Sequence, residues 1–192
     1  MIRRSSVKTA LLLFVVLFLV TGVIYPLLVT GVAGLAFPHQ AHGSLVRNGQ
    51  GEVVGSELIG LNFTGPFYFE GRPSSTPGTP DNAAQSGGSN LGPSNPALFG
   101  KVNTTIRHLE SLGMEGPWPG DLVTSSASGL DPHLTLDAVV SQVPVVARAR
   151  GMSEEEVRIL VNENIVPNPF FPGNVYVNIF SLNRALDRGD RT

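Results

Sequence analysis

An uncharged, apolar run near the N-terminus constrains this chain more than any other feature. From Ala10 to Phe37, 28 consecutive residues include no Asp, Glu, Lys or Arg. As a helix rising about 1.5 Å per residue, this run would reach roughly 42 Å, against a hydrocarbon core of about 30 Å. We therefore predict a transmembrane helix over residues 10–37, with length left for a tilt or a kink.

Two other interpretations of this run are weaker. A buried core helix of this length would carry a polar stripe, and none is present. A cleaved signal peptide is the better alternative, because Gly34 and Ala36 resemble a small-residue cleavage site. Signal peptides have apolar regions of about 7–15 residues, however, and this run is nearly twice that length. A permanent anchor is favoured.

The distribution of charge predicts the orientation. Arg3, Arg4 and Lys8 precede the run, and the next basic residue is Arg47. The positive-inside rule then places residues 1–9 in the cytoplasm and residues 38–192 outside it, on a single-pass protein of the cell membrane. Residues 38–192 carry 15 acidic and 10 basic residues, a formal charge of −5. An acidic domain is a poor binder of nucleic acid, so no nucleic-acid partner is expected. The apolar run predicts the lipid bilayer as a partner.

Residues 38–192 are expected to fold as one α+β domain. The chain has no cysteine, so its stability must come from packing, and a domain of this size can bury a sufficient core. A hairpin is predicted at 44–55 around Asn48-Gly49, a short strand at 67–69, and a strand at 175–179.

Helices are predicted where capping residues flank apolar periodicity. One runs over 96–112, with Asn95 as N-cap and Gly113 as the stop. A second runs over 136–150, capped by Thr135, with a kink at Pro144. A third opens with a capping box from Ser153 to Glu156, and a short closing helix covers 182–186.

A long loop separates the first strands from these helices. Residues 72–96 consist almost entirely of Pro, Gly, Ser, Thr, Asn and Asp, which cannot form a regular element. Loops of this length inside a compact domain are usually functional or disordered. We expect a docking or gating element that a partner orders, since so polar a sequence has few apolar contacts to offset its ordering entropy.

Nucleotide chemistry finds little support in the residues. A P-loop needs a leading glycine and a hydroxyl around Gly-Lys, and Gly100-Lys101-Val102 has neither. The block Ser86-Gly87-Gly88-Ser89-Asn90 superficially resembles the signature loop of ATP-binding-cassette proteins. Because such glycine runs are frequent by chance, a flexible loop that contacts a partner is the favoured interpretation.

Hydrolytic and metal chemistry are also weakly indicated. Five residues of suitable type lie close together in the sequence: Ser125, Ser126, Ser128, Asp131 and His133. A catalytic triad is defined by geometry, and no G-x-S-x-G elbow is present, so a turn before the second helix is favoured. The four histidines form no H-x-x-x-H pair and have no cysteine companions, so no metal site is expected.

The apolar run carries a stripe of small residues. Gly22, Pro26, Thr30 and Gly34 recur every four residues. Such a face lets another transmembrane helix approach closely, although glycine is also common in membrane helices generally. We expect it to pack against a partner helix.

Two blocks of the sequence are distinctive: Ser86-Gly87-Gly88-Ser89-Asn90-Leu91-Gly92-Pro93-Ser94-Asn95 and Ser128-Gly129-Leu130-Asp131-Pro132-His133. With these blocks, the chain resembles the KdpC family, the C subunits of the Kdp potassium-transporting P-type ATPase. Shorter matches are Gly55–Gly60, Phe67–Phe69, Arg72-Pro73, Asp121–Thr124, Gln142–Pro144, Ala149–Gly151, Val177-Asn178 and Leu182-Asn183. The chain departs from the family in its longer Ser126-Ala127-Ser128 run and in lacking a tyrosine just before Ser86.

The resemblance implies an accessory subunit with no catalytic centre of its own. It would assemble with a potassium-translocating subunit and a catalytic ATPase subunit in a high-affinity potassium importer. Members are described as catalytic chaperones that raise the ATP affinity of the catalytic subunit, sometimes as binding ATP themselves. ATP is thus a cofactor implied only by the family, and it conflicts with an extracytoplasmic domain. A membrane-anchored hydrolase and a free-standing binding module remain the alternatives.

Overall fold

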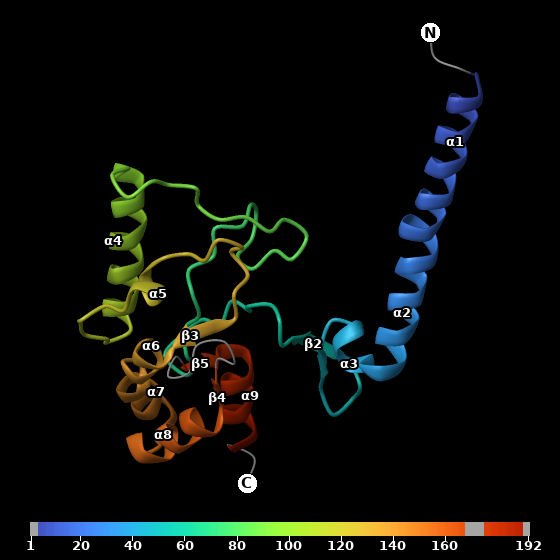
Figure 1. Ribbon diagram of the computed structural model, residues 1–192. Helices are drawn as coiled ribbons and strands as arrows, with labels where there is room; N and C mark the ends of the chain where they lie inside the picture. The colour runs from blue at the N-terminus through green and yellow to red at the C-terminus, as the bar shows by residue number, and fades with distance from the viewer. Residues whose placement is uncertain (1–3, 168–174, 190–192) are drawn as a thin grey trace. The chain divides into compact units, whose positions relative to one another are not determined.

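The computed structural model describes residues 4–167 and 175–189, and the chain divides into two units after Leu45 (Figure 1). Each unit is described by itself. The fold is mixed helix and sheet, as predicted, and its first unit contains the long apolar helix.

The apolar helix is continuous but not regular. It comprises α1 (Arg4–Leu19), a π-helical turn η1 (Val20–Ile24) and α2 (Tyr25–Ala36). Pro26 has no N–H for the carbonyl of Gly22, and its ring would clash with that carbonyl in an α-helix. The helix widens instead, and the Tyr25 N–H donates to the Val20 carbonyl five residues back. The expected irregularity is therefore a π-turn just before the proline.

Among the described residues, 5–36 form the one helix that is long and apolar enough to cross a bilayer. Its large apolar side chains are exposed along its length, from Val7 to Leu35. A short helix α3 (Pro38–Ala41) follows.

The predicted hairpin consists of β1 (Leu45–Arg47) and β2 (Val53–Ser56), and all of it except Leu45 belongs to the second unit. Its turn is organised by Asn48, whose side-chain Oδ1 accepts hydrogen bonds from the Gln50 and Glu52 amides. Gly51 adopts a positive φ of 83°, which closes the turn.

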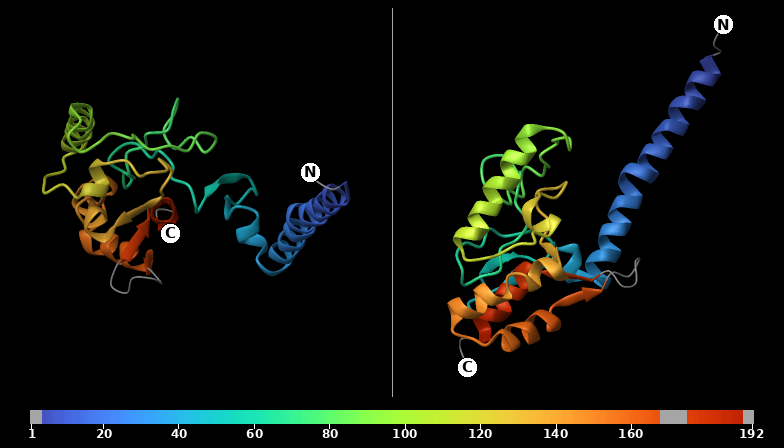
Figure 2. Two further views of the ribbon diagram at one scale, coloured as in Figure 1. Left: turned by 45° about the horizontal axis from the view of Figure 1, so that its top comes forward. Right: turned by 90° about the vertical axis from the view of Figure 1, so that its left-hand side faces the viewer.

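The main sheet has three short antiparallel strands in the order β3-β5-β4. These are β3 (His133–Thr135), β5 (Val175–Asn178) and β4 (Ile165–Pro167). Only β5 was predicted. On β3 and β5, Leu134 and Val177 face each other and are fully buried. Figures 1 and 2 show α6 to α9 gathered around this sheet.

The helices follow the predicted caps with two corrections. Helix α4 (Pro96–Ser111) begins at Asn95, whose side chain accepts from the Ala97 amide, and α8 (Glu154–Glu163) carries the complete capping box. The helix predicted over 136–150 is broken into α6 (Leu136–Val140) and α7 (Val143–Arg150), because Pro144 cannot donate to the Val140 carbonyl. Thr135 does not cap α6 with its side chain; its hydroxyl and amide donate to Asp121 instead.

The remaining elements are α5 (Gly120–Val123), which was not predicted, and α9 (Ile179–Gly189), which is longer than the closing helix expected over 182–186. The core lies between α4, the sheet and the C-terminal helices. Its fully buried large side chains are Phe69, Leu109, Leu122, Leu134, Val139, Val143, Val146, Val157, Val161, Leu182 and Leu186.

The strand predicted at 67–69 is wrong, for a specific reason. The Phe69 N–H donates to Asn183 Oδ1, and Asn183 Nδ2 donates back to the Phe69 carbonyl, both at 2.9 Å. Glu70 makes the same reciprocal pair with the side-chain amide of Gln142. Two buried amide side chains thus take the place of a neighbouring strand for Phe69 and Glu70. Phe67 lies in a turn, in which the Tyr68 N–H donates to the Gly65 carbonyl.

Candidate functional site

The long loop and the serine-rich turn form one junction in the second unit. The Gly87 N–H donates to the Ser128 carbonyl at 2.8 Å, and Ser86 Oγ donates to the same carbonyl at 3.0 Å. The two motifs that look most distinctive in the sequence, Ser86–Asn90 and Ser128–His133, are therefore two sides of a single contact.

Glycine is required at this junction because backbone meets backbone there. A Cβ on Gly88 would lie 2.8 Å from the Ala127 carbonyl oxygen, and one on Gly129 would lie 2.6 Å from that of Gly87. Gly129 also has a φ of 69°, which disfavours other residues. The glycines are explained by this close approach, and the Gly87 amide is already occupied, which leaves one amide fewer for a phosphate group.

The start of the loop is held by short polar side chains. Ser74 Oγ donates to the Gly129 carbonyl at 2.8 Å and accepts from the Asp81 amide at 2.9 Å. Thr76 Oγ1 donates to the Thr79 carbonyl and accepts from the Asn82 amide. Residues 74–82 are thus ordered by contacts within the chain, whereas our expectation was that a partner would supply most of that order.

Ion pairs tie the same junction to the turn before β3. Arg72 Nη1 lies 3.3 Å from Asp131 Oδ2, and His133 Nδ1 lies 3.2 Å from Asp131 Oδ1. Burial alone would raise the pKa of Asp131, but hydrogen bonds from His133 and the charge of Arg72 together hold it below its ordinary value. Arg72 Nε is buried without a hydrogen-bond partner in the described part of the chain.

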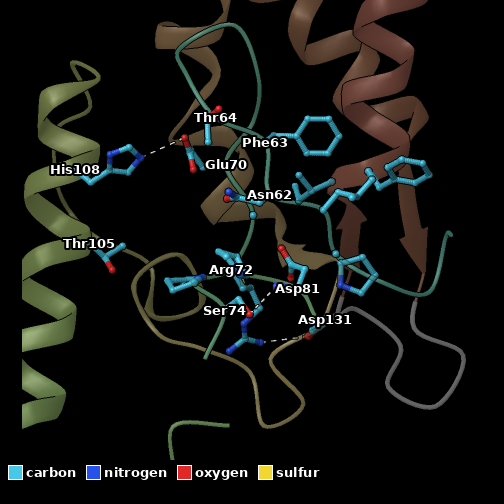
Figure 3. Close-up of a pocket in the computed structure, with 18 of the residues that line it drawn as sticks. Asn62, Phe63, Thr64, Glu70, Arg72, Ser74, Asp81, Thr105, His108 and Asp131 are labelled. Atoms are coloured by element: carbon cyan, nitrogen blue, oxygen red, sulfur yellow. Dashed lines mark hydrogen bonds and ion pairs between the residues drawn. The ribbon is translucent and has the colours of Figure 1, made fainter. Parts of the chain in front are cut away.

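A pocket of about 400 Å³ opens beside this junction, between the loop and α4 (Figure 3). Glu70 and His108 meet across it, with 3.3 Å between Oε1 and Nε2. Burial raises the pKa of Glu70, partly offset by the hydrogen bond from His108, and burial also raises the pKa of Asp81. The lining mixes these charged groups with the apolar surfaces of Leu61, Phe63, Leu109, Ile179 and Phe180.

The arrangement does not resemble a hydrolytic centre. Ser126 Oγ and Ser128 Oγ lie 3.2 Å apart and accept hydrogen bonds from the Gly129 and Leu130 amides, the pattern of a serine turn. His133 points to Asp131, and within the described ranges no hydrogen bond joins it to a serine. The same ranges contain no group of three or more His, Asp or Glu residues placed to hold a metal ion.

The small-residue stripe lies in the first unit, apart from these contacts. Pro26, Thr30 and Gly34 lie in α2, and Gly22 lies in the π-turn, where an added Cβ would touch only the Phe18 ring at 3.6 Å. Around Gly34 there is nothing within 4 Å. Within the described residues of the first unit, the two glycines of the stripe leave room for a neighbouring helix.

Sequence reasoning missed Glu70, Asp81 and His108 as pocket residues. It also missed the roles of Gln142 and Asn183, although both were noted in the motifs. Each is an amide side chain next to a buried apolar residue, Gln142 beside Val143 and Asn183 beside Leu182. A polar amide in such an apolar stretch is the sequence signal that could have indicated a buried hydrogen-bonding role.

Comparison with known proteins identifies the family. Residues 7–188 match the family model described as KdpC: K+-transporting ATPase, c chain. The chain belongs to the KdpC family. This confirms the resemblance drawn from the sequence blocks, and the match includes both the apolar helix and the second unit.

Similar proteins carry the name Potassium-transporting ATPase KdpC subunit. The one from Methanosphaerula palustris is 49% identical over 189 residues, covering 97% of this chain and 99% of its own. Those from Polaromonas naphthalenivorans and a Janthinobacterium species are 51% and 48% identical, covering 96% of this chain and 95% and 99% of their own lengths. The similarity is therefore to whole KdpC subunits.

Proposed function

We propose that this chain is the accessory, non-catalytic subunit of an ATP-driven potassium-import complex. The observation that carries the proposal is the full-length similarity to proteins named as KdpC subunits, covering 97% of this chain and 99% of the relative. The absence of a serine–histidine hydrogen bond in the described residues supports a non-catalytic role over an anchored hydrolase.

The apolar helix anchors the subunit in the cell membrane, with the N-terminus in the cytoplasm and residues 38–192 outside. The helix length and the basic residues Arg3, Arg4 and Lys8 support this topology. The partners are a potassium-translocating subunit and a catalytic ATPase subunit. The open stripe at Gly22, Pro26, Thr30 and Gly34 supplies a face against which a partner helix packs.

The second contact is the exposed part of the glycine-rich loop. Within Ser86–Asn90, Gly87 and Gly88 face the serine-rich turn, whereas the Ser86 and Asn90 side chains remain exposed. A rigid base with an exposed polar rim is suited to docking on a partner subunit.

The subunit raises the ATP affinity of the catalytic subunit by stabilising the assembled complex. Binding to one conformation of a partner shifts that partner's equilibrium by the difference in affinity between its two states, so the effect requires no ATP contact of its own. This indirect role is supported by the glycines of the loop, because the Gly87 amide donates to Ser128 and Gly88 packs against Ala127, so both are occupied by contacts within the chain.

The test is reconstitution. A strain that lacks its own KdpC subunit should regain growth at low external potassium when this chain is supplied with its two cognate large subunits, and the three should co-purify. The complex should also show a lower KM for ATP than the two large subunits alone. Failure to co-purify would contradict the proposal, and an unchanged KM would contradict the role in ATP affinity.

A further inference from the structure

The hairpin and the last helix form a groove that carries three arginines. Arg47 lies on β1, and Arg184 and Arg188 lie on α9; together with Val54, Leu61 and Phe180 they line a hollow of about 660 Å³. All these residues belong to the second unit. The groove combines cationic groups with an apolar floor.

The two elements are locked together, so the groove has a fixed shape. Arg184 Nη2 donates to the Arg47 carbonyl at 3.3 Å, and its guanidinium lies 5.8 Å from the centre of the Phe180 ring. A Cβ on Gly55 would lie 2.7 Å from that ring, so β2 packs directly on α9.

The acidic groups near the groove leave it positive. Asp187 also lines it, but its carboxylate is paired with Arg150 at 2.9 Å and accepts from the Tyr68 hydroxyl. The Glu52 carboxylate accepts a hydrogen bond from Asn48 Nδ2. The negative charge of Glu57 interacts with the guanidinium of Arg184. Three arginines on a domain with a formal charge of −5 make this groove a local exception.

The covalent chain keeps the hairpin near the membrane. Nine residues lie between the end of α2 at Ala36 and Val46, and α3 takes up four of them. With about 1.5 Å per helical residue and 3.3–3.6 Å per extended one, the reach is at most about 25–30 Å. Val53 and Val54 on β2 are also exposed aliphatic side chains, at 49% and 38%. A basic groove beside exposed valines suits a surface of phosphate headgroups above acyl chains.

We propose that the groove between the β1–β2 hairpin and α9 binds the headgroups of anionic phospholipids at the membrane that the apolar helix crosses. The inference rests on the proposed membrane span, but not on the direction of insertion. It orients the second unit on the bilayer surface.

The chain has no cysteine, so a single introduced thiol can be labelled specifically. Val53→Cys carries an environment-sensitive fluorophore, and Ile159→Cys on α8 is the matched control, since both side chains are aliphatic, β-branched and 49% exposed. The full chain is reconstituted into vesicles of phosphatidylcholine, with or without phosphatidylglycerol, that contain a lipid-borne nitroxide quencher. We expect several-fold stronger quenching at Val53 than at Ile159 with phosphatidylglycerol, weakening with salt and with its omission.

The arginines provide a second test. Arg188→Gln, and Arg184→Gln with it, should each weaken the anionic component of quenching at Val53, by about fivefold in the binding constant per arginine. Arg107→Gln on α4 should leave it unchanged. Circular dichroism checks that each variant is folded.

Three results would overturn the inference: equal quenching at Val53 and Ile159, quenching independent of lipid charge, or protection of Val53 only when the pump subunits are present. The last would assign the groove to a protein partner. Alkaline extraction separates this failure from that of the proposed function, because a chain that stays embedded while Val53 remains unquenched retains its span and loses only the groove.

Discussion

The glycines of the apolar helix and those of the loop junction occur in similar sequence patterns but in opposite surroundings. Outside the backbone of the helix itself, a Cβ added at Gly34 would meet no described atom within 4 Å, and one added at Gly22 would meet only the Phe18 ring. At the junction, Gly88 and Gly129 are pressed against carbonyl groups of the opposing segment. The glycines of the helix leave open space beside them, whereas at the junction the opposing backbone fills the space that a side chain would need.

This difference separates two reasons for a small residue. At the junction the small size serves the fold of this chain, because it allows residues 86–88 and 127–129 to meet through their backbones. In the helix, no described residue of the first unit packs into the space that the glycines leave. The open face is therefore where the structure leaves room for another molecule, consistent with the proposed assembly.

The largest expected effect on stability is at the loop junction, where the glycines are tightly packed. Gly129→Val places a β-branched residue at a φ of 69° and a Cβ 2.6 Å from the Gly87 oxygen, which should destabilise the second unit by about 3 kcal/mol or more. Gly92→Val, in the same loop with nothing within 4 Å, is the control. Denaturant unfolding in detergent measures both. Equal midpoints for the two variants would mean that the junction is not tightly closed.

The ion pairs at the junction give a smaller effect that depends on pH. The pKa of Asp131 is lowered in the folded state, so its stabilising contribution is present above its ordinary pKa of about 4 and is lost as the pH falls through the folded value. Asp131→Asn should therefore lose less stability than the wild type between about pH 5 and pH 3, a difference of less than about 1 kcal/mol.

Asp81 is the control of opposite sign. Burial raises its pKa, so its contribution is present at low pH and is lost as the pH rises through the folded value. Asp81→Asn should be at least as stable as the wild type near neutral pH. Unfolding midpoints measured across the acid range give both signs, and parallel curves for both variants and the wild type would contradict this account.

The smallest effect on stability is expected at the exposed end of the loop block. Replacing Asn90 with Gly removes one exposed side chain of this rim, keeps Gly87 and Gly88, and tolerates the positive φ of 52° at position 90. Stability should change by no more than about 0.5 kcal/mol, while potassium transport by the assembled pump falls if this rim contacts a partner. Unchanged transport would remove the loop as a docking element.

What the sequence could predict follows from how local each interaction is. The caps at Asn95 and Ser153 were predicted because the residues that form them are at most a few positions apart. The contact between Glu70 and His108 joins residues 38 positions apart, and no local pattern indicates it.

The missed strands β3 and β4 have three residues each, too few for an alternating pattern to be visible. The strand predicted at 67–69 is wrong because residues 66 and 67 lie in a turn, and because Phe69 bonds to the side chain of Asn183, 114 positions away, which no local pattern indicates. Motif matching identified the loop block and the serine-rich turn separately. Only the structure places them in contact.

The most direct test of the central claim compares Gly34→Leu with Ala36→Leu. Both enlarge a small residue of α2, but the second lies about 160° around the helix from the first. Both chains should unfold at the wild-type midpoint, because a Cβ added at Gly34 would meet no described atom within 4 Å outside the backbone of its own helix. With its cognate large subunits, Gly34→Leu should co-purify far less of them than Ala36→Leu does. Wild-type recovery of the complex with Gly34→Leu would contradict the claim that this open face is where the subunit joins the pump.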